Sequence, residues 1–269
     1  MIPAPFDYLP AESAAHAVEL LARHGDDAKL LAGGHSLLPM MKLRLAAPAL
    51  LIDVGSLAEL AGVRADGGEL VIGAATCHAD LAADELTRAD APLLAHAAAQ
   101  VGDPQIRHRG TIGGSLAHAD PAADLPMALV ALGGSVEVLG PGGSRRETAD
   151  DFFTGFFETS LEPDELLTAV RVPRNPGAGW GYQKFVRRAN DWAIVAAAAT
   201  GGRIALANMG PVPLRAHAAE RALAAGANAA QAAALAADGT SPGEDMHADR
   251  GYRQHLARVL TRRALVQQD

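Results

Sequence analysis

The chain has 269 residues, 49% of them hydrophobic and 20% charged, which is enough for one large domain or two smaller ones with a substantial core. Its formal net charge is −8 and its basic segments at 187–189 and 258–264 are short, which argues against nucleic-acid binding. The single cysteine, Cys77, excludes an intrachain disulfide and a four-cysteine iron–sulfur cluster, and it is typical of a protein of the reducing cytoplasm.

Residues 1–54 predict a βαβ unit. No basic segment followed by an apolar run is present at the start, so no signal peptide is expected, and no apolar stretch approaches the roughly 20 residues that span a membrane. Apolar side chains spaced i, i+3, i+4 and i+7 predict a helix over 10–25. A strand over 28–32 then runs directly into a glycine pair, followed by a short helix over 36–45 and a strand over 49–54.

The middle of the chain predicts hairpins, helices and one long loop. The hairpins are recognised by alternating strands around glycine-containing turns, and the helices by Ala- and Leu-rich stretches. The expected elements are hairpins at 62–74 and 135–149, helices at 89–102 and 124–133, a loop at 110–126 and a strand at 163–173.

A segment rich in proline and glycine, RNPGAGWG at 174–181, is the best candidate for a domain boundary. Beyond it, residues 192–210 predict two strands that turn at Gly201 and Gly202. The remainder predicts helices at 213–226, 229–237 and 248–268. The last part of the chain is therefore expected to be a small α+β unit.

Two glycine-rich stretches have the composition of an anion site. They are AGGHS at 32–36, called here the first glycine loop, and TIGGS at 111–115, the second glycine loop. Glycine between a strand and a helix lets successive backbone N–H groups turn toward one point, and Ser36, Thr111 and Ser115 add hydroxyl donors. Neither loop matches G-x-G-x-x-G or a P-loop. The sequence leaves two interpretations: a ligand with two phosphates held by backbone dipoles, or two tight turns.

The segment HADPAAD permits a third interpretation, because His118, Asp120 and Asp124 are all of metal-binding types. The corresponding function would be a metal-dependent hydrolase. Pro121 interrupts any helix that would align the three side chains. Asp124 is equally suited to cap the following helix or to accept a hydrogen bond from a sugar hydroxyl.

Cys77 and His78 are adjacent and offer the two groups of a nucleophile–base pair. Adjacent side chains rarely face each other, so the sequence favours a core cysteine beside a capping histidine. The chain contains no G-x-S-x-G nucleophile elbow.

A series of motifs spans nearly the whole chain: LLAGGHSLLPMMKLRL, LIDVGSLAEL, IGAATCHADL, VGDPQIRHRGTIGGSLAHADPAADLP, KFVRRANDWAIV and GPVPLRAHAAERAL. In order and spacing, this series resembles the FAD-binding middle subunit of molybdenum hydroxylases. That family includes the medium subunit of carbon monoxide dehydrogenase, and the flavin domain of xanthine dehydrogenase is a fused relative.

The resemblance implies an α+β fold: a two-subdomain FAD-binding fold of the vanillyl-alcohol-oxidase-like (PCMH) type plus a C-terminal α+β domain of the CO dehydrogenase flavoprotein type. It places the FAD-binding domain at 1–174, with subdomains at about 1–55 and 56–174. The C-terminal domain then occupies 175–269, in agreement with the boundary candidate above.

The resemblance also implies the residues of a cofactor site. In the family both double-glycine motifs, here including Ile112, bind the pyrophosphate, an acidic residue matching Asp124 binds the cofactor, and a residue matching Trp192 lies against the isoalloxazine. The matching cofactor-binding positions are Ala32, Gly33, Gly34, His35, Ser36, Leu37, Gly102, Thr111, Gly113, Gly114, Ser115, Asp124, Leu167, Lys184 and Trp192. No catalytic residue and no metal ligand is expected in this chain.

The function implied by the resemblance is electron transfer within an oxidoreductase. In the family, substrate is hydroxylated at a molybdenum cofactor in a large subunit, and electrons pass through two [2Fe–2S] clusters in a small subunit to FAD. The chain is expected in a cytoplasmic heterotrimer, assembled as a dimer of heterotrimers. Its single cysteine agrees with clusters on another chain. The alternatives are the metal-dependent hydrolase at His118, Asp120 and Asp124, and a scaffold subunit without flavin.

Overall fold

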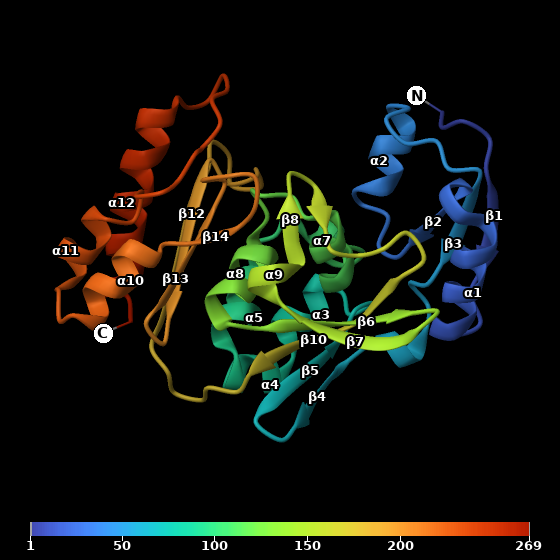
Figure 1. Cartoon of the computed structure of the whole chain (residues 1–269), viewed down its shortest axis with the longest axis horizontal. Coiled ribbons are helices and arrows are strands. Elements are labelled where there is room, and N and C mark those ends of the chain that lie inside the picture. Colours follow the sequence, from blue (N-terminus) through green and yellow to red (C-terminus); the bar gives the residue numbers. More distant parts are fainter. Residues whose placement is uncertain (1, 269) are drawn as a thin grey trace.

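The computed structural model describes residues 2–268 and contains three larger sheets side by side along the long axis of the molecule (Figure 1). A three-stranded sheet has the order β1-β3-β2, a five-stranded sheet the order β4-β5-β10-β6-β7, and a four-stranded sheet the order β11-β12-β13-β14. The mixture of helices with these sheets confirms the predicted α+β class. Within residues 2–268, no helix combines the length and apolar character needed to cross a membrane.

The N-terminal unit is a parallel sheet with helix α1 (Ala14–His24) packed on it. The predicted βαβ unit is confirmed: β2 (Ala28–Leu31) leads through α2 (Leu37–Lys42) to β3 (Leu50–Asp53), and β2 pairs with β3 in parallel. Strand β1 (Asp7–Pro10) was not predicted. All four of its residues are exposed, so neither face of the strand carries a buried row of side chains that a sequence pattern could reveal. Main-chain pairing with β3 stabilises this strand. Two 3₁₀ turns complete this part, at Gly25–Asp27 and Ala58–Leu60.

The central sheet confirms both predicted hairpins and the strand that follows them. The first hairpin is β4 (Val63–Asp66) with β5 (Glu69–Gly73), and the second is β6 (Ser135–Gly140) with β7 (Gly143–Thr148). Strand β10 (Leu166–Pro173) lies between β5 and β6 and pairs antiparallel with both. The strand that is last in sequence thus lies at the centre of the sheet and joins the two hairpins.

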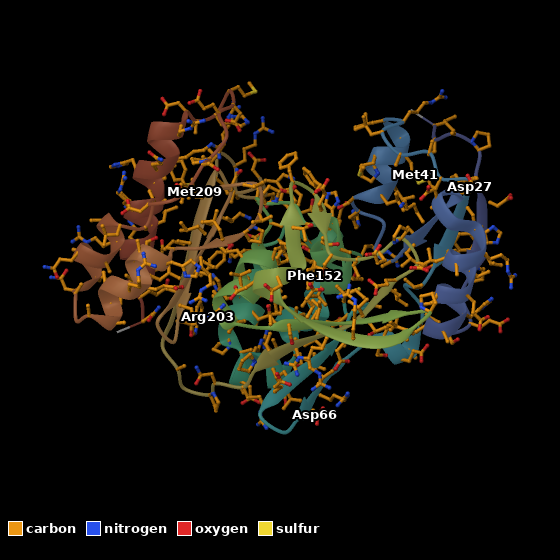
Figure 2. All side chains as sticks on the ribbon, viewed as in Figure 1. Asp27, Met41, Asp66, Phe152, Arg203 and Met209 are labelled. Atoms are coloured by element: carbon orange, nitrogen blue, oxygen red, sulfur yellow. The ribbon has the colours of Figure 1, made fainter. Side chains whose placement is uncertain are left out.

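Short helices pack on the central sheet, and Phe152, labelled in Figure 2, is the largest of the fully buried side chains in this core. The predicted helices at 89–102 and 124–133 correspond to α5 and α8. The elements are α3 (His78–Ala83), α4 (Glu85–Asp90), α5 (Pro92–Ala99), α6 (Pro104–Arg107), α7 (Ile112–His118), α8 (Asp124–Leu132), α9 (Ala149–Phe152) and the small hairpin β8 (Phe153–Gly155) with β9 (Glu158–Thr159).

The predicted loop at 110–126 is wrong in its first half, because residues 112–118 form helix α7. Thr111 caps this helix: its hydroxyl oxygen accepts a hydrogen bond from the N–H of Gly114 at 3.1 Å. Ile112 and Leu116, one turn apart, are fully buried in the core. Tertiary packing therefore overrides the low helix propensity of the two glycines in the first turn.

The C-terminal unit is an antiparallel sheet between helices. Strands β12 (Val195–Thr200) and β13 (Arg203–Ala207) confirm the predicted pair, and the turn between them has left-handed backbone angles at Gly201 and Gly202. Helix α12 (Arg250–Val266) packs on one face of the sheet, and α8 from the central unit packs on the other. The remaining helices are α10 (His217–Ala224) and α11 (Ala229–Ala234).

Two strands of this sheet were not predicted. Strand β11 (Trp180–Phe185) begins within the proline- and glycine-rich segment, and β14 (Leu214–Arg215) takes the start of the helix predicted at 213–226. The glycine in β11 has a packing reason, because a Cβ at Gly181 would collide with the backbone of Ala264 in α12. A composition typical of a linker here permits close packing of helix on strand.

Arg203 is one of the residues that tie the C-terminal sheet to the central unit. Arg203, labelled in Figure 2, reaches from β13 to the end of α8, where its guanidinium donates to the carbonyl oxygen of Val130 at 2.8 Å. It also pairs with Asp150 at 3.1 Å. The hydrophobic core continues across the same junction, because alanines of β12 and β13 belong to the central core.

Candidate cofactor site

A cavity of about 640 Å³, called here the main cavity, brings the N-terminal and central units together. Its lining includes both glycine loops, Asp124, Leu167 and Trp192. Of the residues predicted for the site, Gly102 and Lys184 are outside this lining. Gly102 neighbours the lining residue Val101 and has the left-handed φ of 44°. The structure therefore gathers side chains that are more than 150 positions apart in sequence around one space.

The first glycine loop presents a row of free backbone donors. The N–H groups of Gly33, Gly34, His35, Ser36 and Leu37 donate no hydrogen bond within residues 2–268, and every one of these residues lines the main cavity. Gly34 has a left-handed φ of 74°, which turns the chain between β2 and α2. Five consecutive unpaired donors at the edge of a cavity form an anion-binding concavity.

The first glycine loop touches the backbone that leads into the second glycine loop. A Cβ at Gly33 would collide with the carbonyl oxygen of Arg109, two residues before the second glycine loop. A Cβ at Gly113 would likewise approach the backbone of Ala74 within 3.0 Å. The absence of a side chain at Gly33 thus lets the N-terminal and central units meet at the cavity, and its absence at Gly113 lets α7 pack on the backbone after β5 within the central unit.

The second glycine loop differs from the first in which of its hydrogen-bond donors remain free. The N–H groups of Ile112 and Gly113 bond to the carbonyls of Thr76 and Ala74, at 3.0 and 2.9 Å, and that of Gly114 bonds to the Thr111 hydroxyl. Its remaining polar groups toward the cavity include the hydroxyls of Thr111 and Ser115. The two loops look equivalent in sequence, but the first offers backbone donors and the second offers side-chain donors.

Asp124 is a buried carboxylate held by two residues of β11. Its Oδ2 accepts from Lys184 Nζ at 2.9 Å, and its Oδ1 accepts from the Tyr182 hydroxyl. The side chains of Asp124 and Lys184 are 2% and 8% exposed, so water screens this ion pair little. Burial raises the pKa of the Asp124 carboxyl, and the Lys184 ammonium opposes that shift. Burial and the neighbouring Asp124 raise the pKa of Tyr182 well above its usual value.

Asp124 does not cap helix α8. Asp124 is the first residue of α8, the N-cap position is Ala123, and no side chain in the described range 2–268 caps the helix. The capping role that the sequence left open for Asp124 is therefore wrong. Lys184, predicted to contact the cofactor, donates to Asp124 and to the carbonyl oxygen of Gln100 at 3.4 Å.

The charge of the main cavity favours backbone recognition of an anion. Lys29 is the one lysine or arginine in its lining, against five acidic residues. An anion inside it must therefore be held chiefly by N–H and O–H groups. The rest of the lining is largely apolar and includes the buried Leu167 and the 55%-exposed Trp192, which suit the faces of flat rings.

The metal-dependent alternative is not supported by the geometry. His118 packs against the ring of Phe157 with centroids 5.0 Å apart, Asp120 accepts from the N–H of Ala122 at 2.8 Å, and Asp124 bonds to Tyr182 and Lys184. Among residues 2–268 no group of three His, Cys, Asp or Glu side chains is placed to hold a metal ion.

Cys77 and His78 also lack the properties of a nucleophile–base pair. Burial raises the pKa of the Cys77 thiol and lowers the pKa of His78 to about 4, so both groups are neutral near pH 7. The interpretation of His78 as a helix cap is wrong, because it is the first residue of α3 and is buried against Gly110, directly before the second glycine loop. Its Nδ1 has no hydrogen-bond partner within residues 2–268.

Sequence reasoning missed Tyr182 and His78 as parts of the site. Tyr182 could have been found, because it lies two residues before Lys184 and residues i and i+2 of a strand share one face. His78 gave no such signal, since it meets the cavity only through the folding of α3 beneath Gly110.

Comparison with known proteins identifies the fold. Residues 4–175 match the family described as FAD binding domain in molybdopterin dehydrogenase, and residues 180–268 match the CO dehydrogenase flavoprotein C-terminal domain. The chain is 43% identical to the carbon monoxide dehydrogenase medium chain of Hydrogenophaga pseudoflava, over 98% of this chain and 97% of that one. It is 38% identical to the 6-hydroxypseudooxynicotine dehydrogenase complex subunit alpha of Paenarthrobacter nicotinovorans, over 99% and 95% of the two chains.

Solved structures agree. Carbon monoxide dehydrogenase from Hydrogenophaga pseudoflava superposes with a TM-score of 0.95 at 45% identity, covering 100% of this chain and 98% of that one. Quinoline 2-oxidoreductase from Pseudomonas putida 86 gives a TM-score of 0.93 at 34% identity, with the same coverage. These similarities confirm the resemblance and the fold expected from the sequence motifs. The chain belongs to the FAD-binding medium-subunit family of molybdenum hydroxylases.

Proposed function

We propose that this chain is the FAD-carrying electron-transfer subunit of a heterotrimeric molybdenum hydroxylase. It takes electrons from the [2Fe–2S] clusters of a partner subunit and passes them to an external acceptor. The observation that carries the proposal is the row of five unpaired N–H groups from Gly33 to Leu37 at the edge of the main cavity. Backbone N–H groups without an acceptor are energetically unfavourable, so this row requires an anion or water that accepts from it.

The residues present fit FAD. The N–H groups of the first glycine loop would hold the pyrophosphate, with the hydroxyls of Thr111 and Ser115 as further donors. Asp124 would accept from a hydroxyl of the cofactor, and Leu167 and Trp192 would bound its rings. Bound FAD supplies the redox chemistry, while the chain supplies orientation and electrostatics. The full set of proposed contacts is the set of positions given by the family resemblance. Of these, Lys184 would support the cofactor through Asp124, and Gly102 would do so beside Val101.

The chain's own residues also define the environment of that cofactor. The Asp124 carboxylate is fixed by Tyr182 and Lys184, so its lone pairs point in a set direction before any ligand arrives. His78 remains neutral at physiological pH, because burial lowers its pKa to about 4. The phosphates therefore meet dipoles and hydroxyls rather than mobile cations.

The proposed partners are a large molybdenum-cofactor subunit and a small [2Fe–2S] subunit, assembled as a dimer of heterotrimers in the cytoplasm. The relatives named above as a medium chain and as a complex subunit support a multi-subunit assembly. The single cysteine supports the location of the clusters on another chain, since each [2Fe–2S] cluster uses four ligands.

We also propose a division into an FAD-binding domain at 1–174, with subdomains at 1–55 and 56–174, and a C-terminal domain at 175–269. The three larger sheets support it: the strands of each are confined to one of these three ranges. The two matched families, at 4–175 and 180–268, support it as well.

The test is spectroscopic and kinetic. The purified chain should be yellow and release FAD on denaturation. Alone it should not reduce a dye with any organic substrate, but after photoreduction it should pass electrons to a dye. Substrate-dependent dye reduction should appear only when the large and small subunits are co-expressed. A colourless chain that does not take up FAD would support the scaffold alternative, and substrate turnover by the isolated chain would refute the electron-transfer role.

A further inference from the structure

A second cavity, of about 400 Å³, adjoins the main cavity at Trp192. Trp192 lines both spaces and is 55% exposed, so its indole forms a wall between them. The other lining residues come from the segment between β11 and β12, from the end of β13 and from the region around the start of α12. They are Arg187, Arg188, Asp191, Ala193, Ile194, Asn208, Asp245, His247 and Arg253.

The fixed part of this cavity is the guanidinium of Arg253. It is 3% exposed and donates to the carbonyl oxygen of Ile194 and, at 2.6 Å, to Asp245 Oδ2. The other carboxylate oxygen of Asp245 accepts from the N–H groups of His247 and Ala248, at 2.8 and 3.0 Å. Arg253 Nε is buried without an acceptor in residues 2–268. The acidic group here is thus fully used by its neighbours, whereas a buried donor is left over.

The exposed part of this cavity is a pair of adjacent arginines. Arg187 and Arg188 line the cavity and are exposed, and neither guanidinium forms an ion pair within residues 2–268. Asp191, the one other acid in the lining, directs Oδ2 to the backbone N–H of Arg188 at 3.1 Å. The lining therefore has three arginines against two aspartates, so its formal charge is positive, and the Arg187 and Arg188 guanidiniums are the cations without a carboxylate partner within residues 2–268.

Resting on the function proposed above, we infer that the second cavity binds the oxyanion group of the external electron acceptor, a phosphate or a carboxylate. Guanidinium groups recognise both oxyanions through paired N–H donors. The volume lies within the range of small-molecule sites. An acceptor anchored by Arg187 and Arg188 would lie next to Trp192 and hence beside the main cavity, where the flavin is proposed to bind.

The first arm of the test measures anion binding without turnover. Inorganic pyrophosphate and, separately, malonate are titrated calorimetrically into the purified full chain at constant ionic strength. The variant R187Q/R188Q should bind the preferred anion about tenfold more weakly or worse, as expected for loss of charge-assisted contacts. The matched control R221Q/R262Q removes two exposed arginines outside both cavities and should bind like wild type. Stronger binding of pyrophosphate or of malonate identifies the oxyanion as phosphate or carboxylate.

The second arm tests the link to electron transfer. The flavin of the purified chain is photoreduced, and its reoxidation is followed by stopped flow with a quinone carrying a carboxylate and with the methyl ester of the same quinone. Each reduced flavin gives two electrons and two protons to one quinone, yielding the hydroquinone. R187Q/R188Q should slow reoxidation by the carboxylate quinone roughly tenfold and leave the rate with the ester unchanged.

The outcomes are separable. If neither anion binds wild type, or if R187Q/R188Q binds like wild type, the oxyanion site is refuted. If anions bind as expected but both quinones respond equally to the substitution, the acceptor role is refuted. A chain that carries no FAD would refute the proposed function, while the calorimetric arm would still report on the oxyanion site.

Discussion

The ion pair between Asp124 and Lys184 gives the sharpest prediction about stability and cofactor binding together. Replacing Lys184 with Met keeps much of the side-chain volume but leaves a buried carboxylate with Tyr182 as its remaining side-chain partner. Lys184 is outside the lining of the main cavity, so the substitution removes no proposed direct contact with FAD. Any loss of FAD affinity must then come from a displaced or protonated Asp124.

The magnitude follows from burial. Both side chains are more than nine-tenths buried, so the pair is not screened as a surface pair would be. Removing one partner of a buried ion pair costs about 3–5 kcal/mol, and the retained Tyr182 bond places the expected loss near the lower end, about 3 kcal/mol. The double variant D124N/K184M, which buries no unpaired charge, should recover at least about 1 kcal/mol of that loss.

The pH dependence identifies the cause. Burial already raises the pKa of Asp124 above its unfolded value, and loss of the Lys184 charge raises it further. A raised carboxyl pKa stabilises the fold at low pH and loses that contribution as pH rises through the folded pKa. Urea unfolding should therefore show K184M closest to wild type near pH 5 and furthest from it near pH 8. A loss below about 1 kcal/mol at pH 7, or equal losses at the two pH values, would refute the reasoning.

Two further predictions concern the glycine loops and the buried histidine. Gly33→Ala should abolish FAD retention, because its Cβ would collide with the Arg109 backbone and separate the two loops. Gly114→Ala should keep most of the FAD, because its Cβ would meet only the Thr111 hydroxyl oxygen, at 2.9 Å. The flavin absorbance of the two purified variants tests this, and equal retention would contradict the argument. Burial lowers the pKa of His78 from 6.5 in the unfolded chain to about 4 in the folded chain. The unfolded state therefore binds this proton first, and wild type should lose about 3 kcal/mol of unfolding free energy between pH 7 and pH 4 from this group. In urea titrations at several pH values, His78→Gln should lack this part of the decrease in unfolding free energy.

The sequence predicts those parts of the fold whose signals are local. The first glycine loop follows from a strand, a glycine pair and a helix in succession, and both hairpins of the central sheet follow from alternation around turns. Helix α7 was missed because its stability comes from the burial of Ile112 and Leu116 in a core built by other elements. The difference between the two loops was invisible as well, since it depends on carbonyls of Ala74 and Thr76 accepting from the second loop.

The long-range part of the site shows the same limit. Asp124 was recognised as a site residue through the family resemblance, but its partners lie about 60 residues further along the chain, on a strand whose start had the composition of a linker. No local pattern connects a carboxylate at the start of a helix with a tyrosine and a lysine on a strand of another sheet. These three residues come together only because α8 packs against the C-terminal sheet.

The attachment of Asp124 to β11 has a consequence for biosynthesis. Asp124 and Lys184 are 60 residues apart, so at about 5–20 residues per second Lys184 is synthesised roughly 3–12 s after Asp124. During that interval a nascent chain that buried α8 would bury a carboxylate without its counter-ion. We therefore expect the region around Asp124 to reach its final packing only after β11 has left the ribosome.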